Sequence, residues 1–409
     1  MTLDRLLPVG CKWESLGDIV VDGPTNGYSG STGSDATGSP TLRLSATSSG
    51  ACVLDETTTK RLYETIPSDS NLWLEPGDLL VQRSNTIDLV GTAAIYNGPR
   101  HAYIYPDLMM RLRLREAETA SFVWRYMNSA AGRIFFLRMA AGSSGSMPKI
   151  SGAKLRTMQV PVPPLAEQRR IAEVLDRAEA LRAKRRAALA LLDELTQAIF
   201  LDLFGDPVTN PKGWAMIRLE DLLAMPLRNG LSPSHTGKVV AKVLILSAVT
   251  GDGFDASALK TSTFQSTPPP DQSVNEEDFL ICRGSGNVRL VGKGYFPTGR
   301  LPDVTFPDTM IAARVSPDRI VRAFLQHVWG TAAVRCQIES LARTTNGTFK
   351  VNQTMLEGMT FVAPPFALQQ DFARRIAAVE KLKTAHRASL AELDALFSAL
   401  QHRAFRGEL

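Results

Sequence analysis

The sequence has few cysteines and no long hydrophobic run. The four cysteines among 409 residues are far apart and form no CxxC pair. Together with the lack of a secretory signal, this pattern predicts a protein of the reducing cytoplasm. No stretch reaches the length of about 18 apolar residues that a membrane helix needs, so we expect no membrane span.

Signatures of common catalytic and metal sites are also missing. The sequence contains no GxxxxGK[ST] phosphate loop, no Asn-Pro-Pro-aromatic tetrapeptide of the kind that amino-methyltransferases use, and no glycine-rich turn from a strand into a helix. The five histidines never fall at the short spacings of metal ligands. We therefore expect a chain without catalytic residues, without a metal site and without enzymatic activity of its own.

Charge of one sign is not concentrated anywhere in the chain. Lysine and arginine number 46 and aspartate and glutamate 41, which gives a net charge of +5. This excess permits polyanion binding without requiring it. Since no segment is a basic tail, any DNA contact must come from side chains that a fold positions. The length and a hydrophobic content of 44% fit two or three domains, each with its own core.

The chain resembles itself at an offset of about 201 residues. Residues 76–91 resemble residues 276–292, with one residue inserted before a shared Leu-Val-Gly. The closest match joins residues 149–168 to residues 350–369 and needs no gap. A constant offset across a loop, a Pro-Pro pair and the start of a helix indicates an internal repeat.

Each repeat begins with an irregular part rich in Gly, Ser, Thr and Pro between short apolar runs. Runs such as Asp78–Gln82 and Lys242–Leu246 predict short strands. Ser121–Met139 and Asp318–Ala342 predict helices. We therefore expect a mixed α/β (α+β) fold in both irregular parts.

Each repeat ends in a long helical part. After Pro163-Pro164 the chain reads LAEQRRIAEVLDRAEALRAKRRAALALLDELTQAIF, with no Gly or Pro inside. A helix of roughly 36 residues is about 54 Å long, well beyond the usual globular helix. We expect domains over 1–162 and 205–363, and helical spacers over 163–204 and 364–409. The two helices should pack antiparallel as a coiled coil, which would give the chain pseudo-twofold symmetry.

Apolar residues in both helical parts alternate at spacings of three and four, which predicts the seam of a coiled coil. The polar residues Arg185 and His386 occupy equivalent seam positions, where they either fix the register or extend to solvent. The alternative is that the helices are unrelated and that each lies on its own domain. The expected seam residues are Ile171, Val174, Leu181, Leu192, Leu195 and Ile199, then Phe372, Val379, Leu382, Leu393, Leu396 and Leu400.

These helical segments resemble those of type I restriction-modification specificity subunits. The most specific feature is Pro-Pro-Leu-Ala-Glu-Gln leading into a long helix and returning after a second domain as Pro-Pro-Phe-Ala-Leu-Gln, which lacks the glutamate. The resemblance covers essentially the full chain. It identifies the two irregular parts as target recognition domains.

The resemblance also implies a function and partners. Members of this family bind a split, asymmetric sequence in double-stranded DNA, with one half read by each domain and the distance fixed by the helices. Two methyltransferase (M) subunits dock on the helical region, and restriction (R) subunits join in the full complex, which serves DNA methylation and phage defence. We expect no cofactor on this chain, with S-adenosylmethionine, ATP and Mg on the partner subunits. The expected location is the prokaryotic cytoplasm.

Several loops of the two domains carry residue types that contact bases and phosphates. Arginine can bind guanine, asparagine can bind adenine, and serine or lysine can bind phosphate. The alternative is that a repeated arginine or lysine braces its domain or is only solvated. The first candidates are Arg83, Ser84, Asn85, Arg283, Ser285 and Asn287; the second are Arg343 and Thr344 of the loop 343–347, with Lys149 and Lys350.

Two other functions are compatible with the sequence. In the first, the helices form a coiled-coil interaction scaffold and the domains bind protein without any role in DNA recognition. Salt-dependent binding to random DNA would exclude it. In the second, the chain is a nuclease or methyltransferase with an unrecognised site, which activity of the purified chain would reveal.

Overall fold

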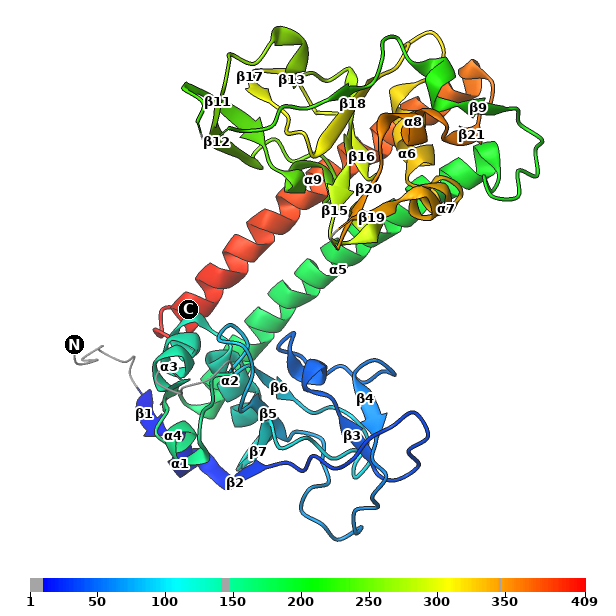
Figure 1. Ribbon diagram of the computed structural model, residues 1–409. Helices are drawn as coiled ribbons and strands as arrows, with labels where there is room; N and C mark the ends of the chain where they lie inside the picture. Colours follow the sequence, from blue (N-terminus) through cyan, green and yellow to red (C-terminus); the bar gives the residue numbers. More distant parts are fainter. Residues whose placement is uncertain (1–9, 141–146, 235, 346) are drawn as a thin grey trace. The chain divides into compact units, whose positions relative to one another are not determined.

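The computed structural model describes residues 10–140, 147–234, 236–345 and 347–409 of the protein (Figure 1). Its contacts divide the chain into two compact units. Unit 1 comprises Met1–Arg186 and Ala388–Leu409, and unit 2 comprises Ala187–Arg387. Each unit thus contains one irregular part together with portions of both long helices. The finer division into 1–162, 163–204, 205–363 and 364–409 stays a prediction.

Unit 1 is a mixed α/β fold around a four-stranded antiparallel sheet with the order β2-β7-β5-β6. Two smaller sheets pair β1 with β8 and β3 with β4. Its elements are β1 (Lys12–Ser15), α1 (Leu16–Ile19), β2 (Val20–Asn26), β3 (Pro40–Leu42), β4 (Thr59–Arg61), β5 (Leu79–Gln82), β6 (Ala93–Ile95), β7 (Met109–Leu114), α2 (Ala117–Met127), α3 (Ala130–Ala140), α4 (Gly152–Arg156) and β8 (Gln159–Val162).

Unit 2 is also mixed α/β and has two four-stranded sheets, with the orders β10-β18-β14-β16 and β12-β11-β17-β13. Smaller sheets have the orders β15-β20-β19 and β21-β9. Its strands and helices are β9 (Met216–Arg218), β10 (Arg228–Asn229), β11 (Val239–Leu244), β12 (Leu259–Phe264), β13 (Ser273–Val274), β14 (Asp278–Cys282), β15 (Gly284–Ser285), β16 (Gly294–Tyr295), β17 (Leu301–Thr305), β18 (Met310–Arg314), α6 (Arg322–Trp329), α7 (Ala332–Leu341), β19 (Arg343–Thr345), β20 (Thr348–Lys350), α8 (Gln353–Glu357) and β21 (Thr360–Val362).

The central strands β5 and β14 are buried on both faces. Successive side chains of a strand point to opposite faces. Leu79 of β5 accordingly packs in the core that unit 1 shares with the long helices, whereas Leu80 packs in a second core on the other face. In β14, Phe279 and Leu280 divide in the same way. Burial on both faces explains why these strands appear in the sequence as continuous apolar runs.

The helices predicted over Ser121–Met139 and Asp318–Ala342 are wrong as single helices, because each is two helices. Asn128 ends α2, and its side chain accepts from the amide of Ala93 and donates to the carbonyl of Ala93 at 3.0 and 2.8 Å. The equivalent break lies at Gly330, between α6 and α7. Side-chain bonds of Asn128 to the neighbouring sheet therefore accompany the first break, whereas the second lies at a glycine, a weak helix former.

The long helices are α5 (Leu165–Phe204) and α9 (Phe366–Ala404). In unit 1, Ile171 of α5 and Ala404 of α9 share a core with β5. In unit 2, Phe200 and Phe204 of α5 contact Phe372 of α9, with ring centroids 5.7 and 5.5 Å apart. The start of α5 thus meets the end of α9, and the end of α5 meets the start of α9, as in an antiparallel pair. Across the described residues, no helix is long and apolar enough to cross a membrane.

The seam prediction is wrong at four of its leucines. Leu181, Leu195, Leu382 and Leu396 are 52, 43, 52 and 49% exposed. In each case the following residue is less exposed instead: Arg182, Thr196, Lys383 and Phe397. The other eight predicted seam residues are buried or half-buried. Neighbouring residues of a helix are about 100° apart around its axis, so the leucine and the residue after it lie on different faces. The apolar pattern alone favoured the leucines over Arg182 and Lys383.

Candidate nucleic-acid interface

Arg83 and Arg283 lie where a buried strand ends and a loop begins. Arg83 follows β5, Arg283 follows β14, and both side chains are half-buried. The Nη1 atom of Arg83 donates to the carbonyl of Asp107 at 3.4 Å, and that of Arg283 donates to the carbonyl of Asp308 at 3.2 Å. Since a guanidinium has five N–H donors, this bracing leaves each arginine able to bind a ligand as well.

In unit 1 the loop after β5 lies beside the segment that carries Lys149. Ser84 and Lys149 form an antiparallel bridge, and the amide of Ile150 donates to the carbonyl of Arg83 at 3.0 Å. The side chain of Lys149 is exposed. Residues from the first and the second group of candidates therefore lie side by side.

In unit 2 the equivalent pairing extends to the three-stranded sheet β15-β20-β19. Gly284 of β15 and Arg343 of β19 both lie opposite Lys350 of β20. Arg343, Thr344 and Lys350 are exposed. Arg343 and Lys350 are directly paired and lie on one face of this small sheet, where the two cations form a surface suited to phosphate oxygens, whereas Thr344 lies on the other face. Asn346, from the same predicted loop, lies outside the described residues.

Other candidates are buried or form hydrogen bonds within the protein. The Ser84 hydroxyl is buried, which contradicts a direct DNA contact by this side chain. The Asn85 amide donates to Gln82 at 2.7 Å and accepts from the amide of Thr86 at 2.7 Å, so it shapes its own loop. In unit 2, the hydroxyl of half-buried Ser285 accepts from the amide of Asn287 at 3.2 Å.

The loops after β5 and β14 are each held by an arginine from a neighbouring helix. Arg133 of α3 donates to the carbonyls of Val90 and Asp88 at 2.5 and 3.0 Å. Arg335 of α7 donates to the carbonyl of Val291 at 2.7 Å. Burial lowers the pKa of Arg133 below its ordinary value. The candidate motifs do not include these arginines, although Ala-Ala-x-Arg at 130–133 returns at 332–335 and could have indicated them.

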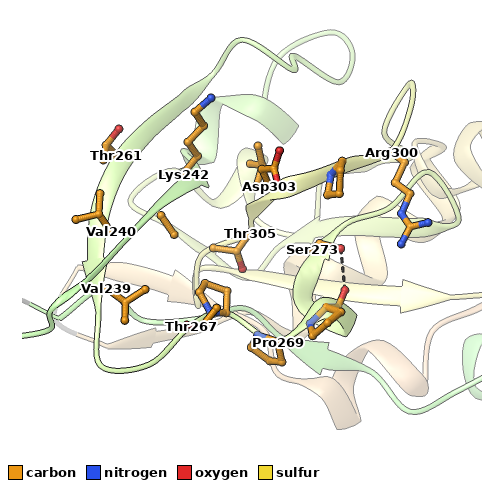
Figure 2. Close-up of a pocket in the computed structure, with 15 residues that line it drawn as sticks. Val239, Val240, Lys242, Thr261, Thr267, Pro269, Ser273, Arg300, Asp303 and Thr305 are labelled. Atoms are coloured by element: carbon orange, nitrogen blue, oxygen red, sulfur yellow. Dashed lines mark hydrogen bonds between the residues drawn. The ribbon is translucent and has the colours of Figure 1, made fainter.

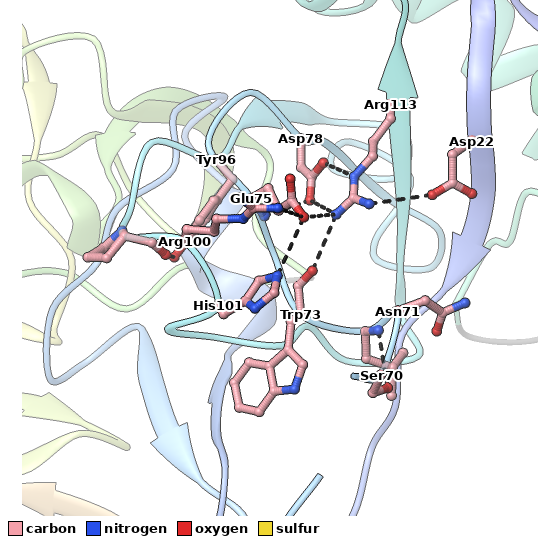
Figure 3. A network of polar contacts seen from close by, with 12 residues as sticks. Asp22, Ser70, Asn71, Trp73, Glu75, Asp78, Tyr96, Arg100, His101 and Arg113 are labelled. Carbon is pink, nitrogen blue, oxygen red and sulfur yellow. Dashed lines mark hydrogen bonds and ion pairs between the residues drawn. The ribbon is translucent and has the colours of Figure 1, made fainter. Parts of the chain in front are cut away.

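The repeated aspartates Asp78 and Asp278 anchor arginines of the neighbouring strand. Figure 3 shows Arg113 of β7 between Asp78 and Asp22, with its Nε atom 2.7 Å from Asp78. The hydrogen bond to Asp78 raises the pKa of Arg113. In unit 2, Arg314 of β18 binds both carboxylate oxygens of Asp278 at 2.9 and 3.0 Å. These pairs fix the strands that precede Arg83 and Arg283, so their role is structural.

Unit 2 also has a hollow of about 570 Å³ on the sheet β12-β11-β17-β13. Figure 2 shows Lys242 and Arg300 among its lining residues, together with Thr261. Val240, on the same strand as Lys242, is 66% exposed. Apolar, hydroxyl and cationic groups around one hollow offer the contacts that base edges and phosphates use. This surface lies outside the predicted site residues, although Val239–Leu244 alternates between half-buried and exposed residues before its buried end.

No group of three or more His, Cys, Asp or Glu side chains that could hold a metal ion occurs within the described ranges. The four cysteines are free thiols. Burial raises the pKa of Cys282 to about 11, so this thiol stays protonated at neutral pH.

Comparisons with known proteins agree on one family. The profile of the type I restriction modification DNA specificity domain matches residues 44–190. The chain is 23% identical over 317 residues to the EcoKI specificity subunit of Escherichia coli (strain K12). The aligned region covers 73% of this chain and 67% of that protein. It is 24% identical over 319 residues to the StySPI specificity subunit of Salmonella potsdam, again with 73% and 67% covered.

Two solved structures share the fold over nearly the whole chain. One, from a study of complex assembly and conformational transition of the type I R-M system, has a TM-score of 0.56 at 20% identity and covers 99% of this chain and 100% of its own. The other is the type I restriction-modification S subunit from M. genitalium, with a TM-score of 0.52 at 11% identity and 99% and 98% covered. Residues 44–190 thus match a type I restriction modification DNA specificity domain, and the chain is similar to type I restriction enzyme specificity subunits over 73% of its length.

Proposed function

We propose that each unit reads one half of a split, asymmetric DNA target. DNA sequence recognition is the role of this family. The observation that supports two readers is the recurrence of one arrangement, in which a buried strand ends in an arginine and the following loop pairs with a segment carrying an exposed lysine. We assign phosphate contacts first to Lys149, Lys350 and Arg343, and base contacts to the loops that begin at Arg83 and Arg283.

An internal duplication is our explanation for this recurrence. Gln168 donates to the carbonyl of Pro163 at 2.9 Å, and Gln369, 201 residues later, donates to the carbonyl of Pro364 at 2.9 Å. The short helices α4 and α8 are likewise capped by the side chain of the residue before them. In this proposal the antiparallel helices form a coiled coil related by a pseudo-twofold axis, and divergence of the two domains makes the target asymmetric.

We further propose that this chain is the non-catalytic part of a larger complex. Two methyltransferase subunits would dock on the helical region, and restriction subunits would join them. S-adenosylmethionine, ATP and Mg²⁺ would bind to those partners and not to this chain. Several leucines of α5 and α9 are 41 to 64% exposed and offer apolar side chains on which a partner could dock: Leu181, Leu191, Leu195, Leu201, Leu382 and Leu396.

Selection from random-sequence duplex DNA tests the proposal. The purified chain with its methyltransferase partner should enrich one split motif. The double variant R343A/K350A should weaken binding to all sequences alike and reduce the slope of log affinity against log salt by about two, since two phosphate contacts are lost. Enrichment of no motif, together with salt-independent binding, would favour the protein-binding scaffold instead.

A further inference from the structure

In unit 1 a half-buried arginine joins α5 to α9. Arg182 is 17% exposed, and its Nε atom lies 2.5 Å from the carboxylate of Asp394 on α9. It also pairs with Glu179 on its own helix. Its guanidinium lies over the ring of Phe397, 4.4 Å from the centroid. Arg186 adds a second cation, 3.2 Å from Glu179 and 3.6 Å from Asp394.

In unit 2 a buried lysine joins the same two helices. Lys383 of α9 is 6% exposed, and its Nζ atom lies 2.9 Å from Asp193 of α5 and 2.9 Å from Glu380 on its own helix. It also donates to the hydroxyl of Thr196 at 3.3 Å. Arg387 lies 3.7 Å from Glu380.

The two ion-pair clusters are equivalent member by member at the offset of 201 residues. Glu179, Arg182, Arg186 and Asp193 on α5 correspond to Glu380, Lys383, Arg387 and Asp394 on α9. Arg182 pairs with Asp394, and Lys383 pairs with Asp193. The two cations are equivalent at this offset, and so are the two carboxylates. Phe397 beneath Arg182 corresponds to Thr196 beside Lys383, so a ring accompanies the guanidinium and a hydroxyl accompanies the ammonium.

Both clusters require one and the same register of the helices. Residue numbers of the paired positions add to 576 in each cluster, for Arg182 with Asp394 and for Asp193 with Lys383. A slip of one heptad in one direction would set Arg182 opposite Arg387 and Lys383 opposite Arg186. Like charges would then meet in a half-buried interface, which destabilises that register.

A slip of one heptad in the other direction removes the carboxylates. Arg182 would then lie opposite Gln401, and Lys383 would lie opposite Phe200. Both cations would lose their interhelical partners, and a buried cation without a counter-ion is costly. Of these three registers, only the observed one gives each cation a carboxylate.

We propose that these two clusters are positioning elements that select the helix register and thereby the spacing between the half-sites that the subunit accepts. This inference rests on the proposed function, in which the helices set that spacing. The clusters act through the helices and not by touching DNA. Their effect should therefore appear in the preferred spacer length and not in the bases selected.

Charge reversal and charge exchange test the proposal in the full chain with its methyltransferase partner. The reversals R182D and K383D should each lower Tm by about 5 to 10 °C. They should also reduce the preference for the wild-type spacer over spacers one or two base pairs longer or shorter by roughly tenfold, with the half-site bases unchanged. The exchanges R182D/D394R and K383D/D193K should restore at least about half of both losses, because each recreates an interhelical pair.

R177E is the matched control. Arg177 lies on α5, is 82% exposed, and its nearest ion-pair partner is Glu173 on the same helix at 3.9 Å. This reversal should leave Tm and the spacer preference near the wild-type values. The inference is overturned if R182D and K383D keep the wild-type spacer preference, or if the exchanges recover no more than the single reversals. If the wild-type chain itself selects no split target, the proposed function fails, which is a distinct result.

Discussion

Inserting four residues into each long helix should lengthen the DNA spacer that the chain prefers by one to two base pairs. The insertion sites lie between Arg186 and Asp193 on α5, and between Arg387 and Asp394 on α9. Each interval spans the same number of residues, so equal insertions keep both ion-pair clusters intact. The inserted residues should be strong helix formers such as Ala, Glu, Leu and Lys.

The magnitude follows from helix and duplex geometry. Four residues add about 6 Å to an α-helix, and base pairs stack about 3.4 Å apart, which gives one to two base pairs. Four residues also turn the helix by about 400°, or 40° beyond one full turn. One base pair turns the duplex by about 35°, so the two rotations are of similar size. An insertion into residues 187–192 of α5 alone would instead break one of the clusters.

Selection of split targets with randomised spacers measures the effect. The doubly extended chain should enrich the wild-type half-sites at a spacer one or two base pairs longer. The chain extended in α5 alone should bind more weakly and with a broader spacer distribution. An unchanged preferred spacer in the doubly extended chain, with Tm near that of the wild type, would refute the view that the helices measure the distance.

Four substitutions test other parts of the structure. R133A and R335A each release one loop, so each should relax selection at one half-site and leave the other unchanged, as read from the enriched motifs. R314A removes the bidentate partner of fully buried Asp278, which keeps Arg228 at 2.6 Å as a second cation, and should cost about 2 kcal/mol of stability in urea denaturation. Burial lowers the pKa of His327 to about 4, and the charge of Lys383 is a smaller cause of the same shift. The unfolded state therefore binds this proton first, and the chain should lose about 2 kcal/mol between pH 7.5 and 5. H327Q should remove that part of the pH dependence, and an unaltered profile would contradict this reasoning.

The long helices could be predicted from sequence because their signals are local. A Pro-Pro start, a run without Gly or Pro, and a repeating apolar pattern do not depend on distant contacts. The seam was harder to predict, since Leu181 and Arg182 are neighbours and either fits a spacing of three or four. The choice depends on Asp394, which is distant in sequence and supplies the partner for the half-buried Arg182. A prediction from the hydrophobic pattern of one helix does not take into account an ion-pair partner on another helix.

The candidate interface was predictable in its repeated residues but not in their roles. Asp78 and Arg83 have equivalents in the second repeat. In the structure, however, Asp78 binds Arg113 of β7, and Arg83 donates to a loop carbonyl. The pairing of Ser84 with Lys149 joins segments about 65 residues apart, which no local pattern encodes. Burial of the Ser84 hydroxyl follows from that pairing.

Mapping methylated adenines in the host genome, with and without the gene for this chain, tests the central claim most directly. If the chain directs DNA recognition through two diverged readers, deletion should abolish methylation at one split sequence whose two halves differ and are separated by a spacer of fixed length. Methylation that is identical in the two genomes, or a lost motif that is continuous, would contradict the account.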